Sequence, residues 1–399
     1  FIGILIIKIG GKISLNFERD KLKKVLVLGT KNYDYDLSNE FKIKGIETFF
    51  CGYQKSCHIP LEKWINIDFT DIRQIINFLD SNTDFDYIIP GSNDLAYITV
   101  SEVLKTYKKR FKIQIDHPKV AKNYLLKSKF KSQKIFDTVL IPQEFDKKNI
   151  IKKNKKIVLK QDKMSGGKGV IFFENGKCLL KFLDKNKLTE KFIIEEYVDG
   201  IGHGISYFVK DGNIIYEFYD DEYYTKDKLA VVATSTPSSL SNIHKQKIKD
   251  FCLNYFDNYK LKNGIFHIQC IRRGKDIYIT ECTRRLAGDF YHQFASLSLN
   301  VSYLSFYIAS FIKSEEVYLK NNINKIIVRI VRDELIDSEI KKSIWLQQKI
   351  EKNFVMKKKL DGFRYGENGK KFLKKDALFL EFNNIKQSQI FCKKLIKNI

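Results

Sequence analysis

The chain has 399 residues, enough for two or three domains, and its 44% hydrophobic and 30% charged residues are typical of a globular protein with a sizeable core. No apolar run approaches the ~20 residues of a membrane-spanning helix, so we expect no membrane partner. The formal charge of +24 comes mostly from lysines scattered along the chain rather than gathered with arginine and aromatic residues, so we expect no nucleic-acid partner.

The start of the chain and the cysteines add two expectations. Residues 1–20 open with an apolar stretch, Phe1–Ile9, that lacks a signal-peptide cleavage pattern, and we interpret them as an extension of doubtful relevance. The seven cysteines are scattered and match no zinc-binding spacing. A reduced, cytoplasmic location therefore fits best.

Residues 21–116 alternate between strand and helix patterns. We predict strands over 25–29, 46–51, 64–67 and 87–91, and helices over 37–44, 71–79 and 94–107. This alternation predicts a parallel α/β sheet of the Rossmann-like kind. A dinucleotide fingerprint is absent, because Gly29-Thr30 does not continue as G-x-G-x-x-G. Ser92, Asn93 and Asp94 follow the last strand, where they either form a ligand-binding edge or cap the next helix.

After His117-Pro118 the pattern becomes α+β. For residues 117–312 we predict a helix over 120–136, strands over 156–160, 169–173 and 192–197, a helix over 176–184, and antiparallel strands over 205–209 and 213–219. Residues 313–399 are predicted to form a small C-terminal α+β region, with strands over 325–331, 353–357 and 377–382 and a closing helix.

The segment most indicative of chemistry is a strand ending at Lys160 followed by the glycine-rich run Ser165–Gly169. Glycines let backbone N–H groups approach phosphate oxygens, and a lysine at a strand end offers those oxygens a charge. The run is not a Walker A loop, and a flexible hairpin turn explains it about as well.

Two later strands add a candidate metal site. Residues 264–269 and 277–285 are predicted to be neighbouring strands joined by a turn at 273–275, which places Gln269 across from Glu281. Both side chains offer the oxygen ligands that Mg²⁺ prefers. The alternative interpretation is a solvated ion pair between Glu281 and Arg285 at the end of the strand.

The order of these motifs resembles the ATP-grasp superfamily, in particular its biotin-carboxylase-like and carbamoyl-phosphate-synthetase-like branch. The resemblance covers residues 21–312 and implies a pre-ATP-grasp domain followed by an ATP-grasp domain that binds ATP and Mg²⁺, with Mn²⁺ as a substitute. It implies the following roles: Lys127 and Lys160 on the phosphates; Ser165, Gly166, Gly167 and Gly169 in the loop over the triphosphate; Glu195, Glu196 and Val198 at the adenine; Glu281, Gln269 and Thr283 on metal; and Arg285, with Lys160, in catalysis.

The resemblance also implies an ATP-dependent ligase that activates a small-molecule carboxylate as an acyl phosphate and joins it to an amine. Gly202 stands where the family has a ribose-binding Glu, and His203 is the expected substitute. Arg284 is expected to clamp a substrate carboxylate and Asp289 to bind an amine. The alternatives are a biotin-carboxylase-type or carbamoyl-phosphate-type enzyme, or a degenerate ATP-binding protein. A homodimer is expected by analogy alone.

Overall fold

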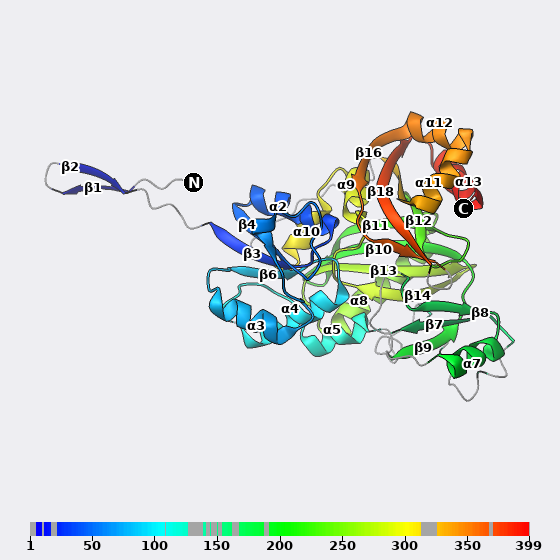
Figure 1. Ribbon diagram of the computed structural model, residues 1–399, viewed down its shortest axis with the longest axis horizontal. Coiled ribbons are helices and arrows are strands. Elements are labelled where there is room, and N and C mark those ends of the chain that lie inside the picture. The colour runs from blue at the N-terminus through cyan, green and yellow to red at the C-terminus, as the bar shows by residue number, and fades with distance from the viewer. Residues whose placement is uncertain are drawn as a thin grey trace.

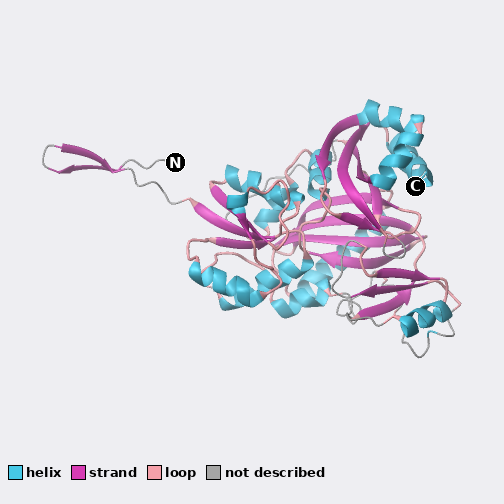
Figure 2. Cartoon of the chain, in the orientation of Figure 1, coloured by secondary structure: helices cyan, strands magenta, loops and turns pink. Residues whose placement is uncertain are grey.

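The computed structural model describes residues 5–9, 12–16, 22–107, 109–126, 139–140, 144, 150, 154–161, 167–186, 191–312, 325–366 and 370–398. Figure 1 shows β1 (Leu5–Ile9) and β2 (Lys12–Asn16) as a hairpin set apart from the rest of the chain. Strands run through the middle of the remaining molecule, and helices lie along its edges (Figure 2). No helix within the described ranges has both the length and the apolar character needed to cross a membrane.

The N-terminal domain is built on the predicted parallel sheet, with strand order β5-β4-β3-β6. In the central strand β3 (Lys23–Leu28), Val25 and Val27 pack in one core while Leu26 and Leu28 pack in another. Both faces of the sheet are therefore covered, as an all-apolar parallel strand requires. The other elements are α1 (Asn32–Tyr35), α2 (Leu37–Ile43), β4 (Ile46–Cys51), the 3-10 helix η1 (Leu61–Lys63), β5 (Trp64–Ile65), α3 (Ile72–Ser81), β6 (Tyr87–Pro90), α4 (Asp94–Thr106) and α5 (Pro118–Leu125).

A small antiparallel sheet of strand order β8-β7-β9 follows. On its covered face, Leu159 of β7 packs against Leu179 of the adjoining helix α7. Side chains alternate along a strand, so Val158 and Lys160 point to the opposite face. The elements are β7 (Ile157–Gln161), β8 (Val170–Phe173), α7 (Gly176–Lys185) and β9 (Phe192–Glu196).

The large antiparallel sheet contains nine strands within the described residues, in the order β14-β13-β10-β11-β12-β15-β18-β16, with β17 paired to β18. Because β12 pairs with β15, the predicted boundary at 312/313 cuts through one continuous sheet. The strands are β10 (Ile201–Lys210), β11 (Asn213–Tyr224), β12 (Val231–Ser235), β13 (Gly264–Arg273), β14 (Asp276–Thr283), β15 (Ile326–Asp333), β16 (Phe354–Lys359), β17 (Phe363–Tyr365) and β18 (Lys371–Phe382).

Helices cover both faces of the C-terminal part of this sheet. Val328 and Ile330 of β15 pack in one core with Leu395 of the closing helix, whereas Ile327 faces the main core, which also contains Phe294. Figure 1 shows α11, α12 and α13 together on one side. The helices are α8 (Asn242–Tyr259), α9 (Tyr291–Leu299), α10 (Tyr303–Ala309), α11 (Glu334–Lys342), α12 (Ile344–Asn353) and α13 (Ile385–Asn398).

Two predicted elements are longer than those in the structure. The helix predicted over 120–136 ends at Leu125, because Leu126 adopts an extended backbone (φ −91°, ψ 121°). Residues 127–138 lie outside the described residues. The strand predicted over 64–67 covers only Trp64–Ile65, since Ile67 N–H turns back to donate to the carbonyl of Ile65.

Candidate functional site

Two adjoining cavities lie along the large sheet. The first, which we call the outer pocket, has a volume of about 190 Å³ and lies between the small sheet and strands β10, β13 and β14. The second, the inner cavity, has a volume of about 300 Å³ and reaches from the large sheet to the N-terminal domain and β18. The residues that line both are Gly167, Tyr224, Leu229, Gln269 and Glu281.

The outer pocket has apolar walls with a charged pair at one side. Val158, Phe172 and Ile271 are among its lining residues, as is the segment from Glu195 to Val198. Lys160 forms an ion pair with Glu195, whose side chain is almost fully buried. A pocket with apolar side chains beside polar backbone and a lysine fits a purine ring with an attached anion.

Left-handed glycines shape the turn that closes this pocket. Gly167 and Gly169 have φ values of +79° and +67°, which other residues adopt only with strain. A Cβ atom at Gly167 would lie 2.5 Å from the carbonyl oxygen of Leu229. This close approach requires glycine and fixes the turn against the loop after β11.

Gly202 lines the outer pocket, whereas His203 lies in the protein interior. A Cβ at Gly202 would lie 2.4 Å from the ring of Tyr224, so Tyr224 occupies the space that a longer side chain would need. His203 is fully buried, and its Nδ1 lies 2.9 Å from Asp221 and 3.1 Å from Ser238. The predicted ribose contact of His203 is therefore not supported, because its ring faces the protein interior instead of the pocket.

Gln269 and Glu281 meet where the two cavities join. They are direct partners across β13 and β14, as predicted. A bulge at Thr280 creates this register: the hairpin pairs Arg273 with Asp276 and Cys270 with Ile279, and the next pair skips one residue. Without the bulge, Gln269 would face Thr280, and Glu281 would point to the other face of the sheet.

Glu222 of β11 completes this junction, and no sequence motif marked it as a site residue. It accepts hydrogen bonds from Gln269 Nε2 at 2.8 Å and from the Tyr224 hydroxyl. Burial raises the pKa of the Glu222 carboxyl, while these two donors act to lower it. Alternation along β11 (Glu222, Tyr224) marks a strand facing a polar cavity, the one signal that sequence offered.

Arg285 and Thr283 are held by the N-terminal domain. Asp94 accepts from Arg285 Nε at 3.0 Å and Nη2 at 3.2 Å, and from the Thr283 hydroxyl at 2.8 Å. Asn93 caps helix α4 through Leu95 N–H, so this segment serves both as a helix cap and as a site edge. The predicted metal role of Thr283 is not supported, because its hydroxyl donates to Asp94 and accepts from the Arg285 backbone.

Arg284 is a structural residue, so its predicted role as a substrate clamp is wrong. Its side chain is 3% exposed, its Nε lies 3.1 Å from Asp116, and its guanidinium stacks on Phe256. Burial acts to lower the pKa of Arg284, but the nearby Asp116 carboxylate raises it overall. The alternation of side chains along β14 continues past its end at Thr283, so Arg284 enters the core and Arg285 lines the cavity.

The far end of the inner cavity carries positive charge from the C-terminal part of the sheet. Arg329 is 6% exposed and stacks over Tyr291 with its guanidinium carbon 5.4 Å from the ring centroid. Among the described residues it forms no ion pair. Lys374 binds Asp289 at 2.6 Å, so the predicted amine-binding role of Asp289 is already filled by a lysine of this chain.

His267 lines the inner cavity in a neutral form. Burial, together with Arg285 and Arg329, lowers the pKa of His267 to about 3. Its Nδ1 lies 2.8 Å from the Ser206 hydroxyl. A histidine with so low a pKa is a poor proton acceptor near neutral pH.

The donor set at the junction fits Mg²⁺. Glu281 supplies a carboxylate with a 35% exposed side chain, and Gln269 supplies an amide oxygen, since its nitrogen donates to Glu222. Hard oxygen donors of this kind suit Mg²⁺. Of the other predicted site residues, Lys127, Ser165 and Gly166 lie outside the described residues.

Comparisons with known proteins identify a domain family for part of the chain and similar folds for most of it. Residues 178–293 match the ATP-grasp domain family. No curated protein sequence matches the chain. Among solved structures, the chain is similar to L-amino acid ligase from Bacillus licheniformis (14% identity, TM-score 0.71, covering 94% of this chain and 97% of that one). It is also similar to N5-carboxyaminoimidazole synthetase from Staphylococcus aureus complexed with ADP (12% identity, TM-score 0.69, covering 94% of this chain and 97% of that one). A third similar structure is phosphoribosylglycinamide synthetase from Anaerococcus prevotii (13% identity, TM-score 0.66, covering 94% of this chain and 98% of that one). The predicted ATP-grasp resemblance and fold class are confirmed.

Proposed function

We propose, since the chain carries an ATP-grasp domain, that it is an ATP-dependent ligase that activates a small-molecule carboxylate and couples it to an amine. One observation carries the proposal: the outer pocket and the inner cavity share a wall formed by Gln269 and Glu281. A nucleotide in the first and a carboxylate in the second would meet at two oxygen-donating side chains. The similarity to structures of ligases and synthetases supports this assignment.

ATP would occupy the outer pocket. The apolar walls and the backbone from Glu196 to Val198 suit the adenine ring, and Lys160 with the turn at Gly167 and Gly169 suits the phosphates. The family resemblance is also what supports the proposed phosphate contacts of Lys127, Ser165 and Gly166. Mg²⁺ held by Glu281 and Gln269 would neutralise phosphate charge and orient the phosphates when bound.

The carboxylate substrate would occupy the inner cavity, facing Arg285 and Arg329. One carboxylate oxygen attacks the terminal phosphorus of ATP, ADP leaves, and an acyl phosphate forms. Arg285 stabilises the charge on the transferred group. The amine nitrogen then attacks the acyl carbon, and phosphate departs as hydrogen phosphate with the proton that the amine gives up.

Release of ADP and phosphate with paired substrates tests the proposal. Since the chain is similar to an L-amino acid ligase, pairs of amino acids with Mg²⁺ and ATP form the first panel, followed by other carboxylates and amines. We expect release that requires both substrates. Lys160→Ala should lower turnover on the order of 100-fold. Lys156→Ala is the matched control, because that exposed lysine on the same segment pairs, among the described residues, with the exposed Glu174.

Other outcomes would select a different function. Release that depends on bicarbonate instead of an acceptor pair would indicate a biotin-carboxylase-type or carbamoyl-phosphate-type enzyme. Tight ATP binding without turnover across the panel would indicate a degenerate ATP-binding protein. A cytoplasmic location is part of the proposal, supported by seven cysteines that form no disulfide.

A further inference from the structure

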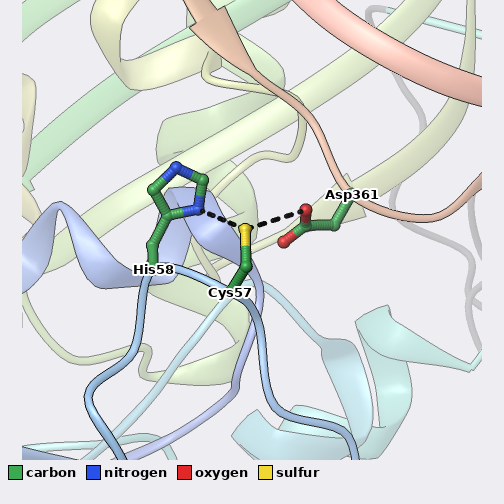
Figure 3. A group of neighbouring side chains, drawn as sticks. All are labelled: Cys57, His58 and Asp361. Carbon is green, nitrogen blue, oxygen red and sulfur yellow. Dashed lines mark hydrogen bonds between the residues drawn. The ribbon is translucent and has the colours of Figure 1, made fainter.

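A cluster of metal-binding side chains lies outside both cavities. Figure 3 shows Cys57, His58 and Asp361 pointing toward one another. Cys57 and His58 belong to the loop between β4 and β5, and Asp361 belongs to the turn between β16 and β17. Among the described residues, this is the one group of three or more His, Cys, Asp or Glu side chains whose ligand atoms lie close enough to bind one metal ion.

The spacing of the ligand atoms is close to what one tetrahedral ion needs. Cys57 Sγ lies 3.3 Å from His58 Nδ1 and 3.8 Å from Asp361 Oδ1, and the ligand atoms of all three lie within 4.8 Å of one another. With metal bonds of about 2.3 Å to sulfur and about 2.0–2.2 Å to nitrogen and oxygen, a tetrahedral ion holds its ligand atoms about 3.4–3.6 Å apart. Movements of about 1 Å or less would bring the three onto one ion.

Packing and hydrogen bonds already fix this arrangement without an ion. Ile59 and Leu360, which flank the two segments, are 1% and 2% exposed and belong to the same hydrophobic core. The Ser56 hydroxyl donates to Asp361 Oδ2 at 2.5 Å, leaving Oδ1 toward Cys57. Partners of this kind orient metal ligands and commonly alter affinity 10–100-fold.

We propose that Cys57, His58 and Asp361 form a zinc site that joins the N-terminal domain to the C-terminal strands, with water as the fourth ligand. Thiolate, imidazole and carboxylate together suit Zn²⁺ rather than Mg²⁺. The exposure of Cys57 and His58 gives the ion access and leaves room for that water. When the zinc–sulfur bond forms, the Cys57 thiol releases its proton to solvent.

The order of contacts argues against a nucleophilic cysteine triad. In such a triad the histidine stands between the cysteine and the carboxylate, so that it can take the thiol proton while the carboxylate orients it. Here Cys57 stands in the middle, in contact with both His58 and Asp361 (Figure 3). Three ligands around one centre fit metal binding better than proton relay.

Cobalt substitution tests the proposal on the full-length, tag-free protein after metals are removed with a chelator. Excess Mg²⁺ is present throughout, to occupy the oxygen ligands of the ATP-grasp cavities. We expect Co²⁺ to give a thiolate-to-metal absorption band that saturates at one ion per chain and disappears when Zn²⁺ is added. Absence of a thiolate band would overturn the proposal.

Variants assign the ligands. Cys57→Ser should abolish the band, His58→Gln and Asp361→Asn should each weaken Zn²⁺ binding about 100-fold or more, and Ser56→Ala about 10-fold. Cys178→Ser, which changes the other exposed cysteine, should leave binding unchanged. A band that persists in Cys57→Ser, or is lost in Cys178→Ser, would refute the assignment.

Two further measurements separate a zinc site from a reactive cysteine and from misfolding. Zn²⁺ should raise the Tm of the wild type but not of Cys57→Ser, whose metal-free Tm should match the wild type because the residue is exposed. Zn²⁺ should also protect Cys57, and not Cys178, from alkylation by iodoacetamide. Alkylation of Cys57 at the same rate with and without Zn²⁺ would contradict the proposal.

Discussion

Replacing Arg284 by Met should destabilise the protein far more than it affects substrate binding. The Arg284 guanidinium pairs with Asp116 and donates to the carbonyls of Lys262 and Asn263, all at 3.1 Å or less. Removing one partner of a buried pair leaves the other charge uncompensated, at about 3–5 kcal/mol. The Asp116 carboxylate also accepts from the hydroxyl of Tyr124 at 2.7 Å, which offsets part of that loss, so we expect the lower end of the range.

Thermal unfolding and kinetics together check this prediction. At about 2.1 cal/mol/K of unfolding entropy per residue, about 3 kcal/mol corresponds to a drop in Tm of about 4 °C for 399 residues that unfold together. Arg284→Met with Asp116→Asn should recover part of the loss, since no charge is then left unpaired. Arg285→Met should instead lower turnover at least about 100-fold. If Arg284→Met left the Tm unchanged and raised the KM for the carboxylate tenfold, Arg284 would bind the substrate carboxylate, and its structural role would be refuted.

Three other perturbations probe the junction, the Asp289–Lys374 pair and the turn. Glu281→Gln should lower ATP turnover about 100–1,000-fold with little change in Tm, measured by ADP release; full activity would remove Glu281 from the metal site. Burial acts to raise the pKa of the Asp289 carboxyl, but Lys374 lowers that pKa overall. The ion pair should therefore stabilise the fold above about pH 4, and this stabilisation should be lost as the pH falls through the pKa of Asp289 in the folded protein. The Tm difference between wild type and Asp289→Asn should accordingly shrink from pH 6 to pH 3, and a difference independent of pH would count against the pair. Gly167→Ala should raise the KM for ATP about tenfold. The control Gly212→Ala has the same φ of +79° but open space around it, so it should cost only about 1–2 kcal/mol of stability. If the two variants changed the KM equally, the contact between Gly167 and Leu229 would be unimportant for ATP binding.

The sequence predicted the local structure and the order of the motifs. Continuous apolar runs such as Val25–Leu28 are typical of buried parallel strands, and they lie where predicted. The roles of Lys160 and the glycine turn stay predictions, although both line the outer pocket as far as they are described. The end of helix α5 was harder to predict, because Leu126 adopts an extended backbone although neither a proline nor a glycine at that position marks the end of a helix.

Tertiary structure decided which neighbours in sequence share the site. Arg284 and Arg285 are chemically identical, and only their opposite directions along the chain separate a core ion pair from a cavity residue. Glu222 and Arg329 come from strands that no motif marks, and the large sheet carries them to the same cavity.

The facing pair of Gln269 and Glu281 shows both contributions at once. A hairpin between them was evident from the turn residues, and their convergence was predicted from it. In a hairpin without a bulge, residue-by-residue pairing from the turn would place Gln269 opposite Thr280. The bulge shifts this pairing by one residue and thereby directs Glu281 toward the junction. Sequence therefore determined which strands pair, and packing in three dimensions determined which side chains face the cavity.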